Sequence, residues 1–334
     1  MSFQTYLNRN TKRMNLMIAD YFQQEVHGDM MRYLYGPLAD YSANGGKRHR
    51  PLICELACLA VGGDPQRSVS AASAIEHFHT AALIHDDIAD ESLLRRGQPC
   101  MHLRVGTGLA INAGDLALAQ VTGLVLADKV LDDATKLRVL DELVQMTVRT
   151  IEGQALDLGW ARDKRFDISS ADYLSMATLK TAHYSGGTPL ATGAIVGGAN
   201  DQTIEGLRSF GLSTGLAFQI QDDLLNLVGK KERTQKDFRS DITEGKRTML
   251  VVHTLEHSSS AEELIKILSE HSHDPNRLDR AVQIMEAAGA FDYARTYATD
   301  LVCDAKKRLG QVLPSNKQVD LLLSMADFFI QRLS

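Results

Sequence analysis

Cysteine is scarce in this chain, and its four copies form no recognisable metal-binding pattern. They are Cys54, Cys58, Cys100 and Cys303, and none has metal-ligand spacing with the histidines. Cys54 and Cys58 lie one helical turn apart, as two small core residues would. Nothing in this set requires an oxidising compartment, so we expect an intracellular, cytoplasmic protein.

Excess positive charge and long apolar runs are lacking too. The net charge is −6 at pH 7, which gives no reason to propose nucleic acid as a partner. Because no uninterrupted apolar run reaches the roughly 18 residues of a membrane span, we expect no membrane span. The first nineteen residues lack the apolar core of a secretory signal, and we interpret them as belonging to the first helix.

Strand alternation, low-complexity linkers and short repeats are also missing, whereas helical periodicity is present throughout. The chain has 334 residues, of which 44% are hydrophobic and only 7 are proline, enough for one sizeable core. We predict a single all-α domain over residues 1–334. The expected helices cover residues 11–35, 51–61, 69–88, 111–130, 132–153, a segment that begins at 169–172 and is interrupted at 186–189, 205–227, and about three more after a charged loop at 230–247.

The expected helix 69–88 ends in a cluster of carboxylates. Asp86, Asp87 and Asp90 follow an apolar run, and Asp86 and Asp90 lie one turn apart on one face. Like charges at this spacing repel each other, and carboxylates on a half-buried helix need a compensating cation. The plain alternative is a solvated helix end.

A second copy of the pattern favours a metal site. Asp222 and Asp223 also follow an apolar helical approach, and Asn226 occupies the position one turn later. Two such faces pointed at each other would form a cage of hard oxygen ligands. Magnesium suits such a site, because it accepts one or two carboxylates and leaves its other positions to water and substrate phosphate.

Cationic residues recur close to these clusters, and diphosphate is a ligand that would need both magnesium and cations. Each set taken alone could be a solvated face or loop. Two of the sets, however, lie immediately downstream of a carboxylate cluster. The sets are Lys47 and Arg50 after paired glycines, Arg95 and Arg96 past the first cluster, Lys180, and Lys236 and Lys246 past the second.

These motifs together resemble the trans-isoprenyl diphosphate synthases, and the geranylgeranyl-forming members in particular. The resemblance runs from about residue 45 to 255 and rests on five motifs in the family's order, at 45–51, 85–97, 180–182, 218–223 and 241–246. It implies an isoprenoid-synthase-type helical bundle around a deep central cavity, assembled as a homodimer. It also implies magnesium-dependent condensation of isopentenyl diphosphate with an allylic diphosphate.

The resemblance assigns roles position by position. Asp86, Asp87, Asp90 and Asp222 would bind three magnesium ions together with the allylic diphosphate, with Asp223 close by. Thr181 and Gln219 would face the allylic cation with oxygen dipoles. The cations divide into two groups: Arg95, Lys180, Lys236 and Lys246 for the allylic diphosphate, and Lys47, Arg50 and Arg96, with His79, for isopentenyl diphosphate. His79 alone could equally be a core histidine.

Asn226 departs from the commoner family pattern, which has aspartate there, and leaves the magnesium affinity open. Two other functions remain as alternatives. A class I terpene cyclase would need a second motif of a different kind where Asp222 and Asp223 stand. A non-catalytic regulatory subunit would typically lack one of the aspartate clusters, and both are present.

Product length should depend on the helix below Asp86. A side chain four or five positions earlier lies roughly 6–7 Å below it, and one eight positions earlier lies about 12 Å below. The nearer positions are Ala82 and Ala81, too small to form a floor, and the farther one is Phe78. We therefore expect geranylgeranyl diphosphate, with a product of 25 carbons or more, or farnesyl diphosphate, as alternatives. A neighbouring helix could also supply the floor.

Overall fold

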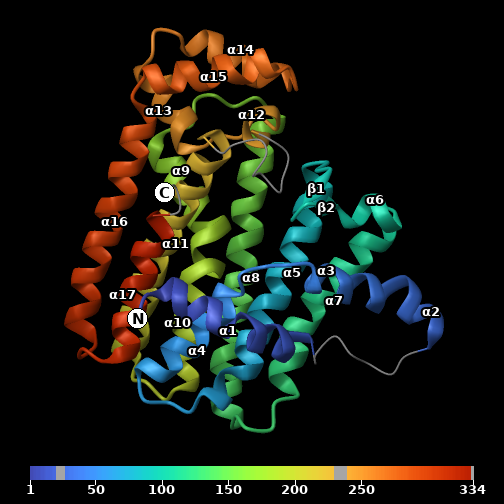
Figure 1. Ribbon diagram of the computed structural model, residues 1–334, viewed down its shortest axis with the longest axis vertical. Helices are drawn as coiled ribbons and strands as arrows, with labels where there is room; N and C mark the ends of the chain where they lie inside the picture. Colours follow the sequence, from blue (N-terminus) through green and yellow to red (C-terminus); the bar gives the residue numbers. More distant parts are fainter. Residues whose placement is uncertain (20–26, 229–238, 332–334) are drawn as a thin grey trace.

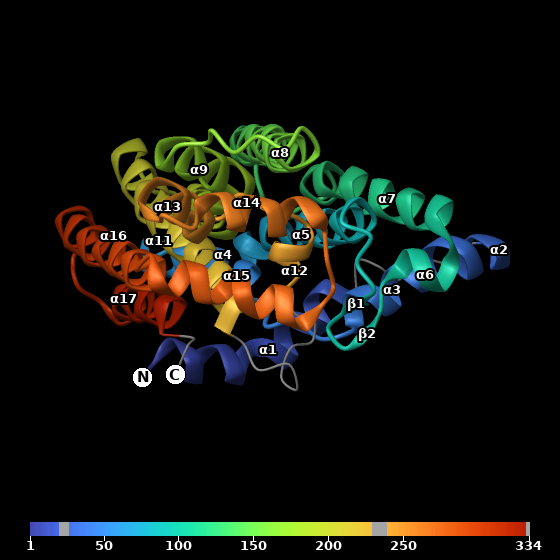
Figure 2. The same cartoon turned by 90° about the horizontal axis from the view of Figure 1, so that it is seen from above.

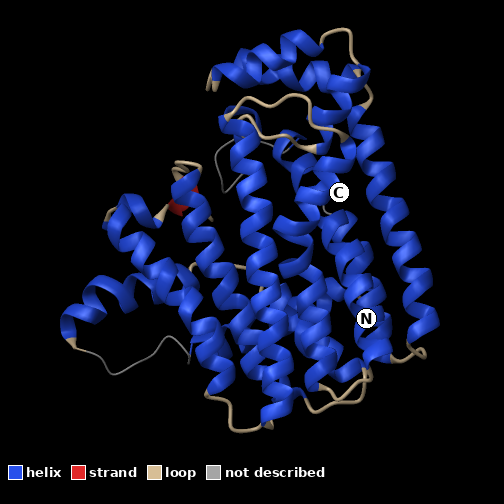
Figure 3. Ribbon diagram, turned by 180° about the vertical axis from the view of Figure 1, so that it is seen from behind, coloured by secondary structure: helices blue, strands red, loops and turns tan. Residues whose placement is uncertain are grey.

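The computed structural model describes residues 1–19, 27–228 and 239–331 and confirms an all-α fold (Figures 1 and 3). The described α-helices are α1 (Phe3–Ala19), α2 (Gly28–Met30), α3 (Gly36–Ala43), α4 (His49–Ala60), α5 (Val69–Ala89), α6 (Met101–Val105), α7 (Thr107–Leu126), α8 (Asp133–Arg162), α9 (Ser170–Ala177), α10 (Thr188–Val196), α11 (Asp201–Val228), α12 (Ser240–Thr243), α13 (Met249–His257), α14 (Ala261–Glu270), α15 (Pro275–Ala287), α16 (Ala290–Val312) and α17 (Lys317–Ile330). The π-helical segments η1 (Met31–Tyr35) and η3 (Thr178–Gly187), the 3-10 helix η2 (Pro65–Ser68) and the strands β1 (Leu94–Arg95) and β2 (Gln98–Pro99) complete the set.

The long helices α5, α8, α11 and α16 run along the long axis of the molecule (Figure 1). Helix α11 packs against η3 and α16, α5 packs against α7, and α4 packs against α10. Helices α14 and α15 lie across one end of this bundle, and α2, α3 and α6 project from one side (Figures 1 and 2). The main apolar cluster fills the bundle, and a smaller one lies where α5 and α7 meet α1 and α3.

Two predicted glycine breaks turn out to be places of close helix packing. Helix α8 continues past Gly153 to Arg162, and η3 runs through Gly186 into α10, so both predicted interruptions are wrong. A Cβ atom on Gly153 would lie 2.2 Å from the backbone nitrogen of Lys180, and one on Gly186 would lie 2.1 Å from the carbonyl oxygen of Gly211. Glycine is needed at these positions because two helix backbones touch there.

The predicted helix over 11–35 is also wrong. Within the described residues α1 covers Phe3–Ala19, the backbone of His27 is non-helical, and a second helical run begins at Gly28 and passes through η1 and α3 to Ala43. Pro37 does not stop it: it is the second residue of α3, directly after the π-helical turn η1, and the helical run passes through it. After residue 247 the described chain contains five helices, α13 to α17, and not about three.

Helix α7 bears on the expected absence of a membrane span. By length and composition it is apolar enough to cross a membrane, although polar residues such as Asp115 interrupt its apolar run. The core helix of a water-soluble protein meets the same criterion, so this is weak evidence for a membrane span. Only 33% of the apolar window is buried within the chain, and the large apolar residues that α7 exposes are Ile111 and Leu126.

Candidate active site

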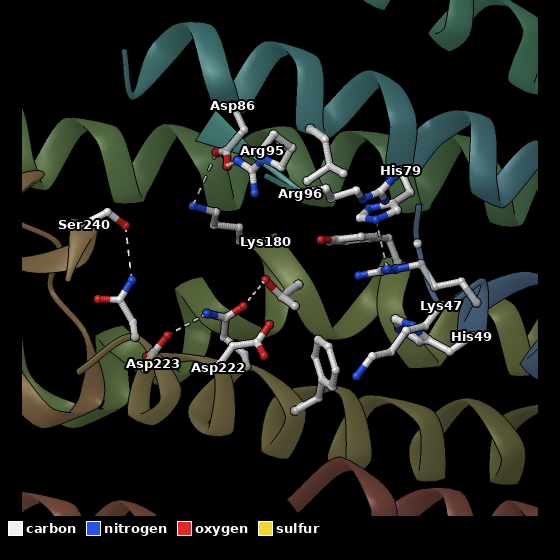
Figure 4. A pocket seen from close by; sticks show the side chains of 18 of the residues that line it. Lys47, His49, His79, Asp86, Arg95, Arg96, Lys180, Asp222, Asp223 and Ser240 are labelled. Atoms are coloured by element: carbon white, nitrogen blue, oxygen red, sulfur yellow. Dashed lines mark hydrogen bonds and ion pairs between the residues drawn. The ribbon is translucent and has the colours of Figure 1, made fainter. Parts of the chain in front are cut away.

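A cavity of about 450 Å³ lies between α4, α5, η3, α11, α12 and the end of α17 (Figure 4). It collects most of the residues that the sequence predicts for the site. The predicted residues that line it are Lys47, Arg50, His79, Asp86, Asp90, Arg95, Arg96, Lys180, Thr181, Gln219, Asp222, Asp223 and Lys246. Lys236 lies outside the described residues, so its predicted role stays a prediction.

The first aspartate cluster faces lysines from the other side of the cavity. Nζ of Lys180 lies 4.0 Å from Oδ1 of Asp86, and Nζ of Lys246 lies 2.8 Å from Oδ1 of Asp90. Gln154 of α8 donates a hydrogen bond of 2.9 Å to Asp86. Burial and the neighbouring Asp86 carboxylate raise the pKa of Asp90, as expected where like charges share one face.

Asp87 is not among the residues that line the cavity, unlike the other predicted metal ligands Asp86, Asp90 and Asp222. Its side chain is buried and accepts hydrogen bonds from the hydroxyl of Tyr41 at 2.9 Å and from Nε of Arg95 at 2.7 Å. Successive residues of a helix point about 100° apart, and Asp87 is turned away from the face that Asp86 and Asp90 share. Asp87 instead anchors Arg95.

A tight turn directs the two predicted arginines to different places. Strands β1 and β2 pair around Arg96 and Gly97, which both have positive φ, as in a two-residue hairpin. Arg95 turns toward the first aspartate cluster, with Nη2 3.7 Å from Oδ2 of Asp86. Arg96 turns to the glycine loop, where it donates to the carbonyl oxygen of Gly45 at 2.9 Å.

The second aspartate cluster is held by a chain of hydrogen bonds. The Thr181 hydroxyl donates to Oε1 of Gln219 at 2.7 Å, and Nε2 of Gln219 donates to Asp223 at 2.7 Å. The hydroxyl of Tyr173, a residue without a sequence signal, donates to the other oxygen of Asp223 at 2.7 Å. Burial raises the pKa of Asp223 to about 7, although both hydrogen bonds lower it.

Asn226 is engaged away from the carboxylates. Its amide donates to Oγ of Ser240 at 3.1 Å (Figure 4), and its carbonyl oxygen accepts from the backbone N–H of Asp241 at 3.3 Å. Asn226 therefore ties α11 to α12, the short helix that precedes Lys246. An asparagine side chain can make both bonds because it carries a donor and an acceptor.

Asp157 of α8 is a site residue that the sequence reasoning missed. It is 4% exposed, and its Oδ2 lies 2.5 Å from Nζ of Lys180 and 3.2 Å from Nζ of Lys246. Burial would raise its pKa, but the two lysines lower it to about 2. No motif marks this residue, because the lysines come from segments distant in the sequence.

The far end of the cavity gathers the cations predicted for isopentenyl diphosphate. Nη1 of Arg50 lies 3.2 Å from Nε2 of His79, and its Nη2 donates to Ser185 at 2.8 Å. The guanidinium lies 4.6 Å from the ring centroid of Tyr184, and the His79 ring stacks on the same tyrosine at 5.8 Å. His79 thus lies in the cavity wall beside Arg50.

The three residues predicted to set product length are not among those that line the cavity in the described part of the chain. Phe78 is buried and its ring contacts Tyr184 at 5.8 Å, so it lies behind the cavity wall. Ala82 is partly buried, one turn before Asp86 on the same face. Ala81 belongs to the apolar cluster between α5 and α7, so the structure does not bring it to the cavity.

The donor set fits magnesium bound together with a substrate. Among the described residues, no three acidic, histidine or cysteine side chains lie close enough to hold a metal ion by themselves. Magnesium typically takes one or two carboxylates and completes its shell with water and phosphate oxygens. Glu244 beside the first cluster also indicates excess negative charge, because burial and Asp90 raise its pKa to about 8.

Comparison with known proteins places this geometry in a family. The polyprenyl synthetase family model matches residues 31–285. The "Short chain isoprenyl diphosphate synthase" of Methanothermobacter thermautotrophicus is 40% identical over 86% of this chain and 87% of its own. The "Geranylfarnesyl diphosphate synthase" of Natronomonas pharaonis is 37% identical, with 86% of each chain covered.

The fold comparison agrees. A crystal structure of geranylgeranyl pyrophosphate synthase from Corynebacterium glutamicum, complexed with isoprenyl diphosphate and magnesium, superposes with a TM-score of 0.90 at 26% identity. The match covers 98% of this chain and 99% of that one. The similarity therefore extends over almost all of both chains.

Proposed function

Because this chain belongs to the polyprenyl synthetase family and is a prenyltransferase, we propose that its cavity condenses isopentenyl diphosphate with an allylic diphosphate to give geranylgeranyl diphosphate. The observation that carries the proposal is that α5 and α11 each present an aspartate cluster to the same cavity. Cations lie at both ends of that cavity. A solvated helix end would need neither feature.

The allylic diphosphate would bind between the two clusters. Asp86, Asp90 and Asp222 would hold the magnesium, three ions in our proposal, which when bound neutralises the departing diphosphate. Lys180 and Lys246 would hold the phosphate oxygens, and Asp157 would keep both ammonium groups in place. Charges that the protein already holds in place stabilise a leaving group more strongly than water molecules, which must reorient as the charge develops.

The carbon chemistry would take place beside Thr181 and Gln219. The C–O bond of the allylic diphosphate breaks, and the hydrogen-bonded oxygens of these two residues face the resulting allylic cation. The isopentenyl double bond attacks this cation and forms the new C–C bond. The proton released from the isopentenyl carbon passes to the departing diphosphate, so atoms and charge balance.

A second copy of the chain would cover the exposed apolar surface of α7 and α8, which lie along one side of the molecule (Figure 2). The exposed large apolar residues there are Ile111, Leu126, Leu137, Val144, Val148, Ile151 and Leu156. Changing both Val148 and Ile151 to Glu should yield a monomer by light scattering, whereas Leu16→Glu on α1 should not. A double variant that remains dimeric would reject this surface.

The function is tested by incubating the purified chain and magnesium with isopentenyl diphosphate and, in turn, dimethylallyl, geranyl and farnesyl diphosphate. Chromatography should detect a twenty-carbon diphosphate. A product of fifteen carbons, or of 25 or more, would overturn the proposed length but not the reaction. No product would favour a regulatory subunit, and a hydrocarbon formed without isopentenyl diphosphate would favour a cyclase.

A further inference from the structure

An aromatic cluster from distant parts of the chain closes one end of the cavity. The ring centroids of Phe218 and Phe329 lie 4.9 Å apart. The His49 ring lies 5.4 Å from Phe218 and 5.7 Å from Phe329. All three line the cavity, and so does Phe328. Helix α17, the last helix, therefore supplies part of the cavity wall.

This wall adjoins the cations predicted to bind isopentenyl diphosphate. Nζ of Lys47 lies 5.7 Å from the ring centroid of Phe328, within the range of a cation–π interaction. Lys47 and His49 come from the same short segment and lie together at this end of the cavity (Figure 4). The segment that matches the family model ends at residue 285, so α17 lies outside it.

Helix α1 packs against the side of α17 that faces away from the cavity. Phe3 is fully buried, and its ring contacts Phe328 at 5.6 Å and Phe329 at 6.5 Å. Its backbone N–H donates to Oγ of Ser324, one turn before Phe328, at 2.9 Å. Helices α1 and α17 pack together, so both ends of the described chain meet behind the cavity (Figure 1).

We propose that Phe328, supported by the fully buried ring of Phe329 6.3 Å away, forms the apolar wall of the isopentenyl diphosphate subsite, and that Phe3 is a positioning residue that holds this wall in place. The inference rests on the proposed function. Isopentenyl diphosphate has a charged head and a five-carbon apolar tail. Cations can fix the head, but the tail needs an apolar surface that excludes water and aims its double bond. Phe328 also fixes the Lys47 ammonium before the head arrives.

The test compares Michaelis constants for the two substrates in the full-length protein. Phe328→Leu keeps apolar volume but removes the cation–π partner, and should raise the Michaelis constant for isopentenyl diphosphate about three- to fivefold. Phe329→Ala should raise it about tenfold or more. The constant for the allylic substrate should stay within about twofold in both variants, since the aspartate clusters are untouched. Phe3→Ala should act like Phe329→Ala, and Phe3→Leu should restore most of the loss.

Phe291→Leu on α16 is the matched control. The Phe291 ring lies 6.0 Å from the guanidinium of Arg295, so this variant also removes an aromatic partner of a cation, but Phe291 does not line the cavity. It should leave both constants unchanged. Thermal unfolding of every variant separates local effects from loss of fold, and the leucine variants remain informative if the alanine variants do not fold. If the Michaelis constants for both substrates change equally, or if neither changes, the proposed aromatic wall is rejected.

Lys47→Ala and Arg96→Ala separate the two levels of the proposal. If they raise the Michaelis constant for isopentenyl diphosphate while the phenylalanine variants do not, the subsite stands and the aromatic wall is rejected. If the lysine and arginine variants also leave it unchanged, the isopentenyl subsite itself lies elsewhere, and the wall is rejected with it.

Discussion

Oδ2 of Asp157 lies 2.5 Å from Nζ of Lys180 and 3.2 Å from Nζ of Lys246, so two lysines share one buried carboxylate. Lys246 in turn reaches Asp90, and Lys180 approaches Asp86. From α8 across to α5 the charges therefore alternate in sign: Asp157 is followed by Lys180 and Lys246, and these by Asp86 and Asp90. A diphosphate entering the cavity therefore meets two ammonium groups whose positions are already fixed.

Replacing Asp157 with Asn should impair catalysis even though Asp157 does not contact the reacting atoms. It leaves two lysines without their shared counter-charge, and a displacement of about 1 Å at such groups can lower turnover by up to about 100-fold. Loss of one partner from a buried ion pair should also cost about 3–5 kcal/mol of stability. Steady-state kinetics and thermal unfolding measure the two effects. Asp163→Asn, at the exposed end of the same helix, is the control, and equal behaviour of both variants would contradict the shared role.

Turnover should require a divalent cation and both aspartate clusters. Asp86→Ala and Asp222→Ala each remove a carboxylate that faces the cavity, and should lower turnover by several orders of magnitude, equivalent to several kcal/mol. Chelation of the metal by EDTA should abolish product formation, and added magnesium should restore it. Near-normal turnover of either purified variant would show that the two clusters do not act on one substrate.

Product length should respond differently to neighbouring positions on α5. Ala82→Phe should shorten the product to about fifteen carbons, because Ala82 lies one turn below Asp86 on the same face. Phe78→Ala should lengthen it. Ala81→Phe should destabilise the protein without setting a new length, because Ala81 packs among residues of α7. Chromatography of the products and thermal unfolding distinguish these results. If Ala82→Phe and Phe78→Ala both leave the product length unchanged, another helix sets that length.

Buried His77 should make the protein less stable in mild acid. It donates from Nδ1 to the carbonyl of Ser73 at 2.8 Å, and burial lowers its pKa to about 4. Between about pH 6.5 and 4 the unfolded chain binds a proton there and the folded chain does not, so stability falls as the pH falls, by up to about 1.4 kcal/mol per pH unit.

Denaturant unfolding between pH 7 and 4.5 measures this dependence. His77→Gln should remove part of the loss of stability across that window, while the part due to buried His79 and His183 remains, whereas His273→Gln, at an exposed position, should leave the loss unchanged. An unchanged slope in His77→Gln would mean that other groups account for the acid sensitivity.

The sequence alone determined the fold class and the chemistry of the site. An apolar helical segment that ends in carboxylates places those carboxylates on one face wherever the helix packs, because spacing along one helix decides which side chains share a face. For that reason Asp86, Asp90 and Asp222 could be predicted to face a common site, together with the cations that follow them.

Contacts between helices were decided only by the tertiary structure. Glycine is the clearest case: Gly153 and Gly186 resemble helix ends in the sequence, yet each sits where a second backbone leaves no room for a Cβ atom. The same holds for Asp157 between two lysines and for Phe3 behind Phe329. The partners in these pairs are 23 to more than 300 residues apart. Side-chain spacing along one helix says nothing about what lies across from it, because packing brings together atoms whose separation in the chain is arbitrary.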